Sequence, residues 1–226
     1  GMASDPDGSI WLTGTTRSVI DFPYQNPPYQ DAINSAGTLL QDVFIAKLRV
    51  QAGGRPELLY YSYFGGRAME TGGQILVDAA GLVYISGATT SNDLPYTAAA
   101  VSDKLGGANN TSNASNQDIF VAKFNPASAT AERSLLYCSY YGGTAFDAPG
   151  ALAFDNRGRL ILAGYGGSTD IEPIVETTLQ PSNRGSYDGL LAVIDTTAAT
   201  AGAALVWNTY WGGAGLDVIN GVAVDA

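Results

Sequence analysis

Short apolar runs of about five residues recur along the whole chain, and they are separated by stretches rich in glycine, asparagine and aspartate. The runs are rich in β-branched and aromatic residues, which favour strands, and none has the periodicity of an amphipathic helix. Because the runs are apolar almost throughout, both faces of each strand must be covered by other elements. The pattern predicts an all-β protein built from small sheets that pack against one another.

Four kinds of strand recur in a fixed order. Strands of the first kind are predicted at 74–78, 151–155 and 221–225, and strands of the second kind at 82–87, 160–164 and 10–14. Strands of the third kind are predicted at 119–123, 43–47 and 190–194, and strands of the fourth kind at 135–140, 58–63 and 205–210. The first two kinds are joined by turns such as Asp78-Ala79-Ala80-Gly81, in which an aspartate followed by glycine suits a tight hairpin.

An aromatic-Gly-Gly motif closes each unit. Its copies are Tyr63-Phe64-Gly65-Gly66, Tyr140-Tyr141-Gly142-Gly143 and Tyr210-Trp211-Gly212-Gly213, spaced by 77 and 70 residues. An acid stands four residues after the last glycine of each copy, and an aspartate stands twelve residues after that glycine. A period of this length indicates a repeat architecture.

We therefore expect one β-propeller-type domain over 1–226, with three four-stranded antiparallel blades per chain. The repeats are predicted at about 3–66, 67–143 and 144–213, and the first strand of the first repeat is supplied by 221–225. Four strands per repeat, with short edges protected by radial packing, are typical of a propeller blade.

Further motifs carry a resemblance to a family. Asp93-Leu94-Pro95 follows a second strand, and Asp118-Ile119-Phe120-Val121-Ala122-Lys123 begins a third strand. With the aromatic-Gly-Gly motif, they resemble the bacterial β-propeller repeat called SBBP over nearly the whole chain. The third unit departs from the pattern, because Asp170-Ile171-Glu172-Pro173 has an inserted residue and 188–193 lacks the Phe and Lys. The resemblance implies a propeller-like module of bacterial secreted or surface proteins, and it transfers no catalytic residue.

Composition narrows the function classes. The net charge of −10 argues against nucleic-acid binding, which needs a basic footprint. No apolar run approaches the roughly 18 residues of a membrane helix, so we expect no membrane insertion. Histidine is absent, which removes the commonest metal ligand and general base. We expect an extracellular, cell-surface or periplasmic location in a bacterium.

Long insertions between the second and third strands, at about 15–41, 88–117 and 165–187, are expected on one face of the domain. Insertions gathered on one face of a repeat protein usually mark its binding face. Their tyrosines could stack on sugars or contact a protein, or could pack their own loops onto the sheets. The candidate ligand-binding residues are Tyr24, Tyr29, Tyr96, Tyr165 and Tyr187.

The repeated acids Glu70, Asp147 and Asp217 are the candidate metal ligands. They precede the first strand of a sheet, so three carboxylates could converge near a central axis and bind Ca²⁺. The alternative is that each acid caps the backbone of its own loop. No cofactor is required by the sequence.

Two functions follow from these observations. The leading hypothesis is a non-enzymatic binding or structural module whose long-loop face contacts protein or carbohydrate. The alternative is a metal-dependent propeller hydrolase of the lactonase or glycosidase type. Catalytic acids should be unique to one site, whereas these acids recur in every unit, which favours the first hypothesis.

The expected partner is a second copy of the chain. Three blades are few for a closed propeller, so two chains are predicted to form a six-bladed ring, each 221–225 strand pairing with the other chain's 10–14 strand. The alternative is that further repeats of a longer parent chain complete the ring.

Overall fold

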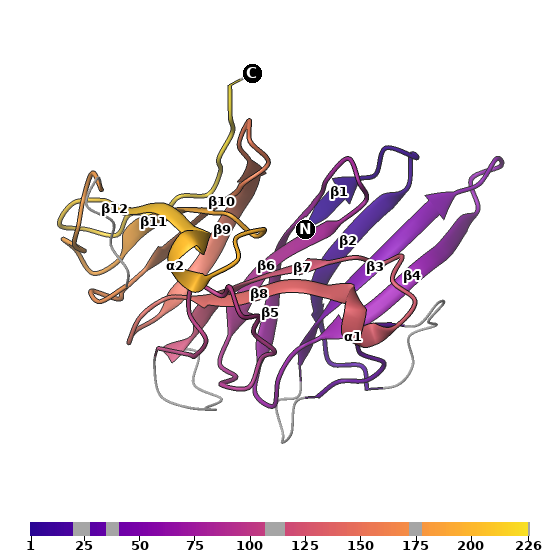
Figure 1. The fold of residues 1–226 in the computed structure, drawn as a ribbon, viewed down its shortest axis with the longest axis horizontal. Helices are drawn as coiled ribbons and strands as arrows, with labels where there is room; N and C mark the ends of the chain where they lie inside the picture. The colour runs from indigo at the N-terminus through magenta and orange to yellow at the C-terminus, as the bar shows by residue number, and fades with distance from the viewer. Residues whose placement is uncertain (20–27, 35–40, 107–115, 172–177, 226) are drawn as a thin grey trace.

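Three four-stranded antiparallel sheets make up the protein, and each consists of strands consecutive in sequence (Figure 1). The computed structural model describes residues 1–19, 28–34, 41–106, 116–171 and 178–225. The first sheet contains β1 (Met2–Ser4), β2 (Ile10–Thr16), β3 (Asp42–Val50) and β4 (Pro56–Phe64); the second contains β5 (Glu70–Val77), β6 (Val83–Thr89), β7 (Asp118–Phe124) and β8 (Leu135–Tyr141); the third contains β9 (Asp147–Phe154), β10 (Leu160–Gly166), β11 (Asp188–Ile194) and β12 (Leu205–Trp211). The predicted all-β class with three four-stranded antiparallel sheets is confirmed.

Two short helices interrupt this pattern. The helices α1 (Ala131–Ser134) and α2 (Ala201–Ala204) lie directly before β8 and β12. Each is one turn long, which leaves no periodicity for sequence analysis to detect. Neither these helices nor any other in the described part of the chain has the length and apolar character that crossing a membrane requires.

The strand register repeats between the sheets. In each sheet a glycine of the second strand lies opposite a large apolar residue of the third strand: Gly14 opposite Phe44, Gly87 opposite Phe120, and Gly164 opposite Leu190. The three sheets are therefore copies of one unit, and positions can be compared between them one by one.

The core lies in the two seams between successive sheets. We call the face that packs on the following sheet the front face and the face that packs on the preceding sheet the rear face. In the first seam, the front face of the first sheet meets the rear face of the second through Trp11, Ile45, Tyr60 and Phe64 against Ile85, Phe120, Phe124 and Tyr140. In the second seam the corresponding residues are Tyr84, Val121, Tyr137 and Tyr141 against Leu160, Leu162, Ala192, Ile194 and Tyr210.

The long connections return to cover the outer edge of each sheet. The carbonyl of Gln30 accepts a hydrogen bond from the amide of Tyr63 at 3.0 Å, and the carbonyl of Ser102 accepts one from Tyr140 at 3.1 Å. The carbonyl of Gln180 accepts the equivalent bond from Tyr210 at 3.0 Å. These contacts occupy edge groups that would otherwise be available to pair with another chain.

The first strand of the first sheet comes from the N-terminus of the same chain. This strand is β1, which pairs Met2 with Leu12 and Ser4 with Ile10, and it is not supplied by 221–225 of the same chain. Residues 221–225 belong to no strand within the single chain.

Candidate functional site

Glu70 caps the turn that enters the second sheet. Its Oε2 accepts the amide of Gly66 at 3.0 Å, while its Oε1 accepts the hydroxyls of Thr89 at 2.6 Å and Ser91 at 2.5 Å. The residue is fully buried. A carboxylate placed four residues after the second glycine thus satisfies the backbone of the turn that the glycines make.

The other two acids have the same role in their own turns. Asp147 Oδ2 accepts the amide of Gly143 at 2.9 Å and the hydroxyl of Ser168 at 2.6 Å. Asp217 Oδ2 accepts the amide of Gly213 at 2.8 Å. The three predicted metal ligands do not come together, and no three acids, histidines or cysteines form a metal-sized group within the described ranges.

A second carboxyl group accompanies each capping acid, and sequence analysis did not select it. A Cβ atom on Gly142 would lie 2.8 Å from Asp118 Oδ1 and 2.8 Å from Asp147 Oδ2, so the two carboxyl groups flank this glycine. Asp42 with Glu70, and Asp188 with Asp217, flank the equivalent glycines. The sequence contains a pattern that marks these second acids, because the third strand of every unit begins with aspartate.

Burial changes the charge of these carboxyl groups. It raises the pKa of Asp118 to about 8 and that of Glu70 to about 7, with Asp147 and Asp42 respectively adding repulsion. Burial also raises the pKa of Asp147 to about 6. The pair of Asp118 and Asp147 therefore carries less than its full negative charge near pH 7, which weakens its attraction for a cation.

We predict weak Ca²⁺ binding at most, and no tight Zn²⁺ site. The capping oxygens already accept hydrogen bonds from turn amides and hydroxyls, and the chain has no histidine. Titration calorimetry with each ion tests this expectation. Tight binding of Zn²⁺, or tight binding of Ca²⁺ that is lost in Asp147→Asn, would contradict it.

Three of the candidate tyrosines are engaged within the fold. The ring of Tyr29 packs 6.0 Å from Phe64 and 5.4 Å from Phe124, and burial raises its pKa to about 12. Tyr165 and Tyr187 lie 6.2 Å apart in a half-buried cluster with Phe146, whose ring is 5.7 Å from each of them. Tyr29 and Tyr187 follow the alternative in which loop tyrosines pack onto the sheets, whereas Tyr165 is itself a residue of β10.

Tyr96 differs from them, because 57% of its surface is exposed. It follows Pro95 in the long connection of the second sheet. Tyr24 lies outside the described residues.

Two hollows lie on either side of this Pro95–Tyr96 step. The first has a volume of about 450 Å³ and is lined by residues 29–34 together with Gly65, Asp93 and Pro95. The second has a volume of about 470 Å³ and is lined by residues 96–98 and 100–104 together with Ala201. The stretch 93–97 therefore contributes to both hollows: Asp93 and Pro95 line the first, and the exposed Tyr96 lines the second together with Thr97.

The polar groups around Tyr96 can both donate and accept hydrogen bonds. Asp93 and Asn34 line the first hollow, and Ser102, Asp103 and Lys104 line the second. Asp93 also holds the turn before β5, because its Oδ1 accepts a hydrogen bond from the backbone amide of Arg67 at 2.9 Å. An aromatic ring with such neighbours can bind a ligand that has one apolar face and several hydroxyl groups.

Comparison of the sequence with models of protein families and with curated proteins finds no match.

Proposed function

We propose that this chain is a non-enzymatic binding module of β-propeller type, and that its long-loop face binds carbohydrate through Tyr96 and the two hollows beside it. The observation that carries the proposal is the exposed ring of Tyr96 between two hollows that present carboxylate, amide, hydroxyl and ammonium groups.

The division of labour between repeated and unrepeated residues supports this assignment. Each acid that recurs in every unit has a carboxylate oxygen that accepts a hydrogen bond from its own turn. The long connections differ in length and sequence from unit to unit. The Asp-x-Pro-Tyr step that carries Tyr96 has a sequence counterpart at Tyr24 in the first unit and none in the third. Binding sites of repeat proteins usually lie on such unrepeated loops, which a rigid scaffold positions.

The ligand class follows from the chemistry of the surface. The apolar face of a sugar ring can pack on the phenol of Tyr96, while its hydroxyls bond to groups such as Asp103 and Lys104. A net charge of −10 disfavours nucleic acid and strongly anionic glycans.

A radial arrangement of the sheets is part of the same proposal. The front face of one sheet packs on the rear face of the next through two equivalent seams, as successive propeller blades do. With the resemblance to SBBP repeats, this supports a module displayed on the surface of a bacterium or secreted from it.

Tyr96→Ala is expected to weaken glycan binding at least tenfold while leaving the unfolding midpoint unchanged. A neutral or cationic glycan selected on an array gives the ligand, and calorimetry gives the affinities. The matched control is Val50→Ala. Val50 is 58% exposed and is the last residue of β3, at the opposite end of the strand from the long connection that precedes it. Equal loss in both variants, or an array without a bound glycan, would contradict the proposal. If the chain binds a protein and no glycan, and Tyr96→Ala loses that binding, then the long-loop face is still the binding face and the ligand class is protein.

A further inference from the structure

The front face of the third sheet is exposed where the same face of the other two sheets is buried. Trp211 holds the position of Phe64 in the first sheet and Tyr141 in the second, as the strand register shows. The exposed fractions are 60% for Trp211, 0% for Phe64 and 2% for Tyr141. Phe64 and Tyr141 are covered because a sheet follows, and within the described residues no sheet follows the third.

The rear face of the first sheet is built like the rear faces that are buried. Phe44 holds the position of Phe120 and Leu190. Met2 holds the position of Ile75, yet 71% of Met2 is exposed whereas Ile75 is 2% exposed. Ala46, Tyr61 and Tyr63 of this face are buried within the chain, whereas its first-strand end at Met2 is exposed where a preceding front face covers the other two sheets.

Residues 217–225 lie against the third sheet as the first strand of a following sheet would. The amide of Asp217 donates to the carbonyl of Tyr187 at 2.8 Å, as the amide of Glu70 donates to Gln41 at 3.1 Å before the second sheet. The segment then continues in extended form beside the β9–β10 turn (Figure 1), where the side-chain amide of Asn156 donates to the carbonyl of Asp225 at 3.2 Å. The segment has the sequence position of a first strand, but it belongs to no sheet of the single chain.

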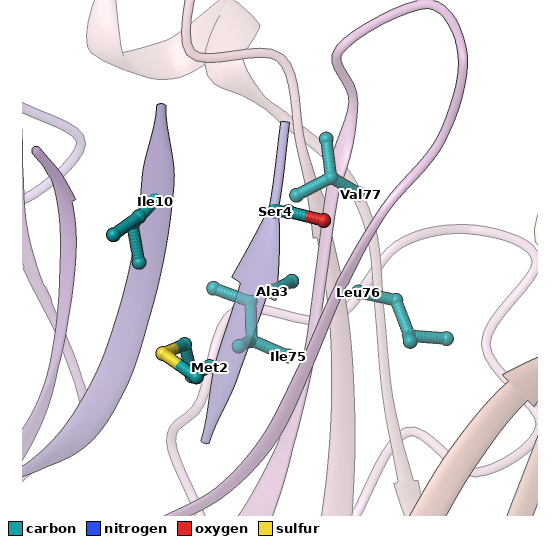
Figure 2. A pocket seen from close by; sticks show the side chains of 7 residues that line it. All are labelled: Met2, Ala3, Ser4, Ile10, Ile75, Leu76 and Val77. Atoms are coloured by element: carbon teal, nitrogen blue, oxygen red, sulfur yellow. The ribbon is translucent and has the colours of Figure 1, made fainter. Parts of the chain in front are cut away.

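In the first sheet, β1 fills the first-strand position incompletely. It has three residues, whereas β5 and β9 have eight each. Ser4 stands opposite Ile10, at the position that Val77 and Phe154 hold in the other sheets, and Val224 takes this position in the repeat. Figure 2 shows the residues that line a mainly apolar hollow between β1 and β5, whose volume is about 530 Å³.

The first sheet also holds a hydroxyl that suits Asp217. Thr16 is paired with the third strand as Thr89 is, and the hydroxyl of Thr89 donates to Glu70 at 2.6 Å. Pairing between β1 and β2 ends at Leu12, so no residue of β1 faces Thr16. Asp217, the third-unit counterpart of Glu70, would meet Thr16 if 217–225 lay beside β2.

We propose that two copies of this chain associate, the front face of each third sheet packing on the rear face of the other copy's first sheet, and that 217–225 replaces β1 beside β2 of the other copy. Each contact joins the third sheet of one copy to the first sheet of the other, and two such contacts close a symmetric dimer. The exchange buries Trp211, puts Val224 in the place of Ser4 opposite Ile10, and brings Asp217 to Thr16.

Light scattering at micromolar concentration tests the association. The expected mass is twice the chain mass of 23.4 kDa. Trp211→Asp is expected to give the single-chain mass, whereas Leu136→Asp stays paired, because Leu136 is 43% exposed on the fourth strand of the central sheet. A wild-type protein at the single-chain mass, or a Trp211→Asp variant that stays paired, would overturn the proposal.

Engineered disulfides test the strand exchange. Residues paired across antiparallel strands lie about 5 Å apart at Cα, which a disulfide can bridge. The double variant Ile10→Cys with Val224→Cys should give a covalent dimer on oxidation, and Ile10→Cys with Ser4→Cys serves as the within-chain control. If only the control pair forms a bond, β1 keeps its place and the exchange is refuted.

Discussion

Replacing Gly87 with alanine is expected to destabilise the protein by about 3 kcal/mol. A Cβ atom at this position would overlap the backbone carbonyl oxygen of Thr71 and the ring of Phe120, which is fully buried in the first seam. The carbonyl belongs to the paired strand β5 and cannot move away without breaking the sheet. Chemical denaturation measures the change as a lower midpoint.

The control for this variant is Gly202→Ala in α2. No atom lies within 4 Å of a Cβ at Gly202, and alanine is the better helix former, so stability should rise by up to about 1 kcal/mol. A Gly87→Ala protein as stable as the wild type would show that the second sheet does not pack as described.

The second large effect is a loss of stability as pH rises from 5 to 9. Burial raises the folded-state pKa of Asp118 to about 8, of Glu70 to about 7 and of Asp147 to about 6, all above ordinary unfolded values near 4. The folded state therefore binds more protons than the unfolded state between about pH 4 and 8, and stability falls through this window. At about 1.36 kcal/mol per pH unit, these three pKa values correspond to a loss on the order of 8 kcal/mol between pH 5 and 9, or about 25 °C in Tm.

Asp118→Asn should remove much of this dependence. The asparagine oxygen can still accept the amide of Gly106, which donates to Asp118 at 2.8 Å, and the side chain can no longer ionise. The variant is expected to be more stable than the wild type at pH 9 and nearly equal at pH 5. Asp103→Asn, at an exposed acid, is the control and should leave the profile unchanged. A stability that rises from pH 5 to 9 would contradict the raised pKa values.

The strands were predictable because their information is local. Each apolar run, the Asp-x-x-Gly turn and the aromatic-Gly-Gly motif lie within a few residues, and their repetition sets the number of sheets. The predicted strand at 119–123 lies within β7, and that at 135–140 lies within β8. The helices α1 and α2 were missed because one turn leaves no periodic signal.

The site was predictable only in part, because its contacts join distant residues. The sequence indicated that Glu70 recurs, but its meeting with Ser91 and with the Asp42 carboxyl depends on how three strands align. Burial of Tyr29 against Phe124 likewise depends on the seam between two sheets. Tyr96 could be named in advance, whereas the hollows beside it follow from where the long connection folds back.

The most direct test of the account is the glycan affinity of three proteins measured by calorimetry at pH 7: wild type, Tyr96→Ala and Asp147→Asn. If repeated acids hold the scaffold and the unrepeated loops bind, Tyr96→Ala loses affinity at least tenfold and Asp147→Asn keeps the wild-type value. A folded Asp147→Asn protein that loses affinity as strongly as Tyr96→Ala would place the repeated acids in the ligand site and contradict the account.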